Sequence, residues 1–113
     1  MTIQELEIFG ANTKEGLTRC LNNESFYLSL VRKFAQEDKI EQLRAAAEAR
    51  DFDKAFGIAH NLKGSTGNLA LTPLYKPIAE MSDLLKVRTD MDYSPYIEEI
   101  TRQFQSLKEF FQI

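Results

Sequence analysis

The segment 59–71, with the sequence AHNLKGSTGNLAL, holds the only histidine of the chain, His60. Lys63 follows three residues later, and Gly57, Gly64 and Gly67 lie close by in sequence. Glycine costs about 1 kcal/mol relative to alanine inside a helix. A helix that carries its one imidazole among these glycines gives up helix stability, and we expect it to gain room for a large group to approach His60.

A helical projection places these residues on one face. With about 100° of rotation per residue, the His60 side of a helix over 52–69 carries Asp53, Phe56, Gly57, Lys63, Gly64 and Gly67. The opposite side is the predicted buried stripe, made of Ala55, Ile58, Leu62, Thr66 and Leu69. We therefore expect His60 to point outward or into a shallow groove.

The residue types on this face suit phosphoryl chemistry. An imidazole with the ordinary pKa of about 6.5 is largely neutral near pH 7, and its free nitrogen is a competent nucleophile. Lys63, one turn from His60, favours an anion bound beside the ring. Asn61 and Ser65 are further candidate donors to a phosphoryl oxygen, although Ser65 leans toward the buried side. These residues together predict a phosphorylated histidine.

Composition excludes several other classes of protein. The 113 residues are 43% hydrophobic and 27% charged, as in an ordinary soluble domain, and we expect one domain over 1–113. The net charge of −3 argues against a nucleic-acid surface. The single Cys20 has no disulfide or zinc partners, so we expect a buried apolar side chain there.

The chain also has no sequence signal for a membrane. No apolar run reaches the roughly 20 residues that span a bilayer, and the N-terminal sequence MTIQELEIFG resembles no signal peptide. We expect a cytoplasmic protein that does not bind membranes and is a monomer. We also expect that no kinase or receiver domain is fused to it, so that its partners act in trans.

The remaining patterns are helical. Start and stop signals predict short helices near 2–10 and 12–21 and longer ones over 24–37, about 38–50 and 52–69, a helix from Thr72-Pro73 to a loop at 87–93, and a last helix opened by Ser94-Pro95. Pro77 leaves open whether the sixth helix starts or kinks there. These lengths and short connections predict an all-α fold, an antiparallel four-helix bundle with one or two short N-terminal helices packed on it.

The apolar positions of these helices indicate which faces are buried. The predicted stripes are Phe26, Leu30 and Phe34 in the third helix, Ile40, Leu43 and Ala47 in the fourth, Leu74, Ile78, Met81 and Leu85 in the sixth, and Ile97, Ile100, Phe104, Leu107 and Phe111 in the last. We expect Phe104, Phe110 and Phe111 to belong to the core. For Phe56, packing in the bundle and a role in an apolar docking patch both stay open.

The segment 59–71, AHNLKGSTGNLAL, closely resembles the signature of histidine-containing phosphotransfer (HPt) domains, roughly A-H-x-L-K-G. The resemblance extends over the NNESFYLSLVRKF helix, the LRAAAEARDFDKAFGIAHNLKG hairpin and the order of the bundle helices. It implies that His60 exchanges a phosphoryl group with aspartates of receiver domains, that Lys63 supports the phosphoryl oxygens and that Gly64 gives steric clearance. The family usually has glycine where this chain has Ala70, which leaves open whether the helix ends at Leu69 or Ala70.

The sequence also predicts what the protein does not supply. It has no glycine-rich nucleotide-binding signature and no acidic cluster for Mg²⁺, so we expect a phosphocarrier without kinase activity or a cofactor. The receiver domains of hybrid histidine kinases and response regulators, the implied partners, would bring Mg²⁺ and the acidic residues. Phe56, Gly57, Asn61 and Gly67 are the predicted partner-binding residues around His60.

Two other functions are alternatives to this interpretation. One is a scaffold or inhibitor that has the same fold and binds receiver domains without phosphotransfer; the presence of both His60 and Lys63 argues against it. The other is a metal-binding four-helix bundle. With one histidine and no E-x-x-H pair, the chain lacks the ligands of a di-metal carboxylate site.

Overall fold

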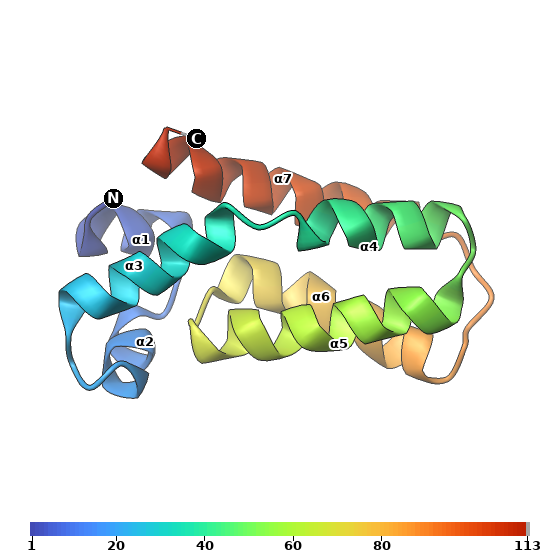
Figure 1. The fold of residues 1–113 in the computed structure, drawn as a ribbon, viewed down its shortest axis with the longest axis horizontal. Coiled ribbons are helices and arrows are strands. Elements are labelled where there is room, and N and C mark those ends of the chain that lie inside the picture. Colours follow the sequence, from blue (N-terminus) through green and yellow to red (C-terminus); the bar gives the residue numbers. More distant parts are fainter. Residues whose placement is uncertain (113) are drawn as a thin grey trace.

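Seven helices make up most of residues 1–112, which are the residues that the computed structural model describes (Figure 1). No strand occurs among these residues. The helices are α1 (Ile3–Phe9), α2 (Thr13–Arg19), α3 (Glu24–Ala35), α4 (Lys39–Glu48), α5 (Phe52–Asn68), α6 (Thr72–Lys86) and α7 (Ser94–Phe111). The all-α prediction is therefore confirmed.

Helices α4 to α7 form the predicted bundle. Each packs against the next along the chain, and α4 also contacts α7, so the four helices close into a ring. The short connections make successive helices antiparallel, and α5 and α6 share the most extensive contact. Helix α3 lies end to end with α4 and occupies the other end of the molecule, where it packs with α7 and α2, while α1 packs on α2 and α7 (Figure 1).

The capping signals locate the N-terminal helices correctly. Thr2 accepts a hydrogen bond from the Glu5 amide while the Glu5 side chain accepts one from the Thr2 amide, which is the predicted capping box. Gly10 ends α1 with φ 112°, a left-handed conformation that suits glycine. Asn23 caps α3 by accepting from the Phe26 amide.

The predicted buried face of α3 is correct at Phe34, but Tyr27 and Val31 are buried there in place of Phe26 and Leu30. Phe26 is 49% exposed, and the next residue, Tyr27, is fully buried instead. The Tyr27 hydroxyl donates to the Leu69 carbonyl over 2.7 Å, and a Cβ at Gly16 would lie 2.3 Å from the Tyr27 ring. Tyr27 thus packs between α2 and the end of α5, which fixes the rotation of α3 about its axis. The buried side chains of α3 are Tyr27, Val31, Phe34 and Ala35.

The other stripes are largely confirmed. All four predicted residues of α6 are fully buried, and so is Leu43 in α4, where Ala46 takes the place predicted for Ala47. Cys20 is buried, as expected. The predicted core aromatics of α7 are only half-buried and cover the edge of the core; they are Phe104, Phe110 and Phe111.

Helix α6 begins one residue earlier than its capping signal predicts. Leu71 is the N-cap residue and Thr72 is already helical, so Thr72 does not cap with its side chain and Pro73 occupies the second helical position. Pro77 lies inside the helix and does not start it. The loop at 87–93 is as predicted, since α6 ends at Lys86 and α7 begins at Ser94.

Among residues 1–112, no helix combines the length and the apolar character that crossing a membrane requires. Helix α5 lies at the surface of the bundle, with one face toward the core and the other toward solvent.

Candidate functional site

Helix α5 carries all the predicted site residues and is fixed at its start by Asp51. The Asp51 side chain accepts a hydrogen bond from the Lys54 amide, which is an N-cap. The side chains that attach α5 to the bundle are Ala55, Ala59, Leu62 and Thr66. Ile58, which was predicted in this stripe, is only half-buried because the small Ala59 faces the core instead. This packing fixes the rotation of α5, which leaves His60 exposed.

The surface on either side of His60 is open. A Cβ added at Gly57 or at Gly64 would meet no atom within 4 Å, and both glycines are exposed. Neither glycine is therefore needed for packing within the bundle. The prediction that glycine gives access to the imidazole agrees with this geometry.

Phe56 lies directly against the imidazole. The centroids of the Phe56 and His60 rings are 5.7 Å apart, with their planes tilted by 35°. The other neighbour of Phe56 is Arg88, whose guanidinium carbon lies 5.2 Å from the ring centroid. Arg88 is held there by Asp53 Oδ1, 2.7 Å from its Nε, and by the Leu85 carbonyl. Phe56 is thus half-buried: it packs against the core of the bundle, and its ring also lies beside His60.

Lys63 lies one turn from His60 on α5 and reaches across to α6. Its Nζ is 3.5 Å from Asp83 Oδ1. The side chain of Lys63 is 35% exposed and that of Asp83 is 71% exposed, so this ion pair is at the surface. Lys63 is the cation that the chain places nearest in sequence to His60.

The two other candidate donors are partly engaged. Asn61 is exposed, and its Oδ1 accepts a hydrogen bond from Lys39 Nζ over 2.8 Å. Ser65 donates from its Oγ to the Asn61 carbonyl over 3.2 Å, within the helix. The amide nitrogen of Asn61 therefore stays the better placed donor of the two at the surface, while Ser65 bonds its own backbone.

A groove of ≈ 480 Å³ runs from His60 toward the end of α5. Lys63, Gly64 and Gly67 line it from α5, Tyr75 lines it from α6, and α2 contributes Glu15 and Arg19. A Cβ at Gly67 would lie 3.3 Å from the Tyr75 ring, so this glycine also allows α5 and α6 to approach.

Arg19 fastens α2 to this end of the groove. Its Nη1 donates to the Gly67 carbonyl over 2.6 Å, and its Nη2 pairs with Glu15. Nothing in the sequence points to Arg19, Asp83 or Arg88, because each comes from another helix or a helix end and no local spacing connects it with His60.

The hydrogen bonds at the end of α5 show the role of position 70, where the chain has alanine and the HPt signature usually has glycine. The Leu71 amide donates to the Thr66 carbonyl and the Ala70 amide to the Gly67 carbonyl, which is the hydrogen-bond pattern of a Schellman motif. The last residue of α5 is therefore Asn68, with Leu69 as its C-cap, and Ala70 takes the left-handed position with φ 54°. This position favours glycine because a side chain strains it, so the alanine affects the helix end and not the surroundings of His60.

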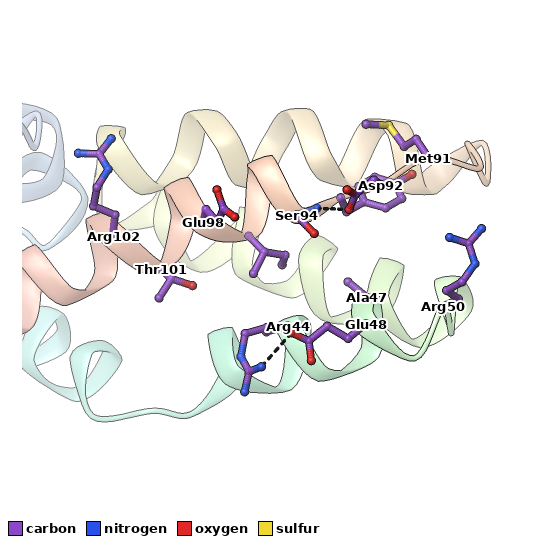
Figure 2. A pocket seen from close by; sticks show the side chains of 12 residues that line it. Arg44, Ala47, Glu48, Arg50, Met91, Asp92, Ser94, Glu98, Thr101 and Arg102 are labelled. Carbon is purple, nitrogen blue, oxygen red and sulfur yellow. Dashed lines mark hydrogen bonds and ion pairs between the residues drawn. The ribbon is translucent and has the colours of Figure 1, made fainter.

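A second, larger groove lies away from His60, between α4 and α7 (Figure 2). Its volume is ≈ 720 Å³, and Figure 2 shows Arg44 beside Glu48 and Ser94 beside Asp92 along its walls. The arginines that line it are paired with carboxylates, Arg44 with Glu41 and Glu48, Arg50 with Asp90 and Arg102 with Glu99. It contains no imidazole or thiol, so the candidate site for chemistry is at His60.

One family of known proteins matches most of the chain. The family model for the Hpt domain matches residues 28–110, which include all of α4, α5 and α6 and most of α3 and α7. No curated protein and no solved structure matches the chain. Since the family match covers well over half of the 113 residues and includes His60 and Lys63 on α5, the chain belongs to the Hpt domain family.

Proposed function

We propose that the protein is a phosphocarrier in a multistep two-component phosphorelay. His60 accepts a phosphoryl group from the phospho-aspartate of one receiver domain and passes it to an aspartate of another. Hpt domains act in phosphorelays as phosphocarrier modules and not as kinases. The observation that carries the proposal is the exposed imidazole of His60 between Gly57 and Gly64, where an added Cβ would meet nothing within 4 Å.

The chemical step needs an in-line approach and little else from this chain. A lone pair on an imidazole nitrogen of His60 forms the P–N bond as the P–O bond to the receiver aspartate breaks, and the aspartate leaves as a carboxylate with the electron pair. The reverse step on a second receiver breaks the P–N bond. Phosphoryl transfer of this kind depends mainly on positioning and on neutralising charge.

The residues around His60 supply the positioning and one cation. Lys63 supports the phosphoryl oxygens from one turn away, and Gly64 leaves space for the incoming receiver. We propose that the receiver domain brings Mg²⁺ and the acidic residues that hold it. The carrier itself then needs no cofactor.

The docking face that we propose is centred on α5. Phe56, Gly57 and Gly67 surround His60 there, with Asn61 and Lys63 toward the rim. A carrier must release each receiver after transfer, so an interface below about 1,200 Å² is suitable. The protein would act as a monomer in each encounter.

The test is transfer from a radiolabelled phospho-receiver to the wild-type protein and to His60→Gln. We expect label on the wild type that is lost in acid and kept in base, as for a phosphoramidate, and no label on His60→Gln. Circular dichroism should show the same helix content in both proteins, because His60 is exposed at the surface of α5.

Lys54→Gln is the matched control. Lys54 is exposed on the same helix but lies about 120° around it from His60, so its label should equal that of the wild type. Label on His60→Gln would contradict the proposal. A wild-type protein that binds receivers but takes no label from any of them would favour the alternative, a scaffold or inhibitor with the same fold.

A further inference from the structure

The ammonium group of Lys63 already has an anionic partner in the unphosphorylated protein. Its Nζ lies 3.5 Å from Asp83 Oδ1, across the contact between α5 and α6. Helices α5 and α6 share the most extensive contact of the bundle, so the backbones that carry the two residues are held in a fixed relation. The pairing is therefore a feature of the packed bundle.

A phosphoryl group on His60 would compete for the same ammonium. Lys63 is three residues after His60, and residues at this spacing are neighbours on a helix surface. A bound phosphoryl group adds negative charge beside the ring. The other cation of this groove, Arg19, is bonded to the Gly67 carbonyl and to Glu15. The phosphoryl group and the carboxylate of Asp83 would then compete for the ammonium group of Lys63.

We propose that Asp83 is a positioning residue for phosphotransfer, which acts through Lys63. Its carboxylate holds the ammonium toward α6 while His60 is free, and the phosphoryl group must draw Lys63 away from it. Asp83 thereby lowers the affinity of the carrier for the phosphoryl group and favours its release to the next receiver. This inference rests on the proposed function of His60.

The size of the effect follows from the exposure of the pair. An exposed ion pair contributes up to about 1 kcal/mol in typical measurements, which corresponds to about a fivefold change in an equilibrium constant. We therefore expect Asp83→Asn to shift the transfer equilibrium toward the phosphorylated carrier by about two- to fivefold. The half-life of the phosphohistidine should lengthen in the same direction.

The experiment uses four proteins that form a double-mutant cycle: wild type, Asp83→Asn, Lys63→Ala and the double variant. Each is phosphorylated chemically with potassium phosphoramidate and then mixed with one receiver domain and Mg²⁺. The equilibrium fraction of phosphorylated carrier is measured for each. Glu80→Gln is the charge-matched control, because Glu80 is exposed on α6 one turn before Asp83 and forms no ion pair within residues 1–112.

The outcomes separate the inference from the function on which it rests. A two- to fivefold shift for Asp83→Asn that disappears in the Lys63→Ala background, with no shift for Glu80→Gln, supports the role of Asp83 through Lys63. An unchanged equilibrium for Asp83→Asn, or a shift of equal size without Lys63, overturns it. If the wild type takes no phosphoryl group and exchanges none with the receiver, the proposed function itself fails.

Discussion

The ring of Phe56 lies against the imidazole of His60, with 5.7 Å between their centroids and an angle of 35° between their planes. Arg88 covers the Phe56 ring as well, with its guanidinium carbon 5.2 Å from the centroid. Phe56 is therefore both a packing residue and part of the surface that a partner would meet at His60.

Phe56→Ala should weaken receiver binding with a modest loss of stability. Because Phe56 is half-buried, we expect the free energy of unfolding to fall by about 1–2 kcal/mol, less than the 3–5 kcal/mol typical of a fully buried phenylalanine. Loss of an apolar anchor beside His60 should raise the Kd for the receiver about tenfold. Urea unfolding and a receiver titration on the same sample measure the two effects.

Phe52→Ala is the matched control for this substitution. Phe52 is also a half-buried phenylalanine on α5 beneath an arginine, Arg50, but it lies two turns before His60 and packs on Tyr93. It should lose similar stability and keep the wild-type Kd. Equal loss of affinity in both variants would mean that Phe56 acts only through stability.

Gly64 offers a test in which stability and transfer move in opposite directions. A Cβ at Gly64 would meet no atom within 4 Å, and alanine or leucine is a better helix former than glycine by about 1 kcal/mol. Gly64→Ala and Gly64→Leu should therefore raise the free energy of unfolding by up to about 1 kcal/mol. Transfer from a phospho-receiver should slow in both, and more for leucine, because the side chain occupies the path of the partner.

Rapid-quench kinetics would measure the transfer rate of the Gly64 variants, and thermal melts would measure their stability. Gly67→Ala is the useful comparison. Its Cβ would lie 3.3 Å from the Tyr75 ring, so the free energy of unfolding should rise less than in Gly64→Ala. Gly64 variants that melt lower and transfer at the normal rate would identify Gly64 as a packing residue, contrary to the open space beside it.

Ala70→Gly should stabilise the protein. Ala70 has φ 54°, where an L side chain costs about 1–2 kcal/mol and glycine does not. Allowing for the greater freedom of glycine in the unfolded chain, we expect a net gain of about 1 kcal/mol, seen as a higher urea midpoint with an unchanged m-value. Ala49→Gly, at the end of α4 with φ −76°, has no strain to relieve and should gain nothing. Equal effects at both positions would argue against strain at Ala70.

The buried hydroxyl of Tyr27 should make the protein less stable at high pH. Burial first of all, and then the charges of Cys20 and Glu15, raise the pKa of the Tyr27 hydroxyl from 10.0 to about 12. Below pH 10 the hydroxyl is protonated in both the folded and the unfolded chain, and its full contribution to stability is present. Between pH 10 and 12 only the unfolded chain ionises, which lowers the free energy of unfolding by about 2 kcal/mol.

Comparison of the wild type with Tyr27→Phe isolates this effect. At pH 7 the variant should be less stable by about 1–3 kcal/mol, because the Leu69 carbonyl loses the hydroxyl that donates to it. The difference between the two proteins should shrink as the pH rises from 10 to 12, while the titration of Tyr93 is common to both. A difference that stays constant over this range would show that the hydroxyl of Tyr27 is not protected in the folded protein.

The sequence alone determined the helical fold and the position of His60 on it. Local signals set these features, because caps such as Thr2 and Asp51 satisfy the first amides of their own helices and glycine spacing is read within one helix. The period of apolar residues also fixed the exposed face of α5, since the buried stripe around Leu62 needs only the geometry of a helix.

Only the tertiary structure decided which residues from other helices meet this face. Asp83 reaches Lys63 from α6, and Arg88 covers Phe56 from just beyond the end of that helix. The two residues of the first pair are 20 positions apart in the chain, and those of the second are 32 apart. The burial of Tyr27 in place of Phe26 has the same origin, because Gly16 and the Leu69 carbonyl provide its site. Such contacts depend on how packed helices are rotated against one another, and no periodicity within a single helix specifies that rotation.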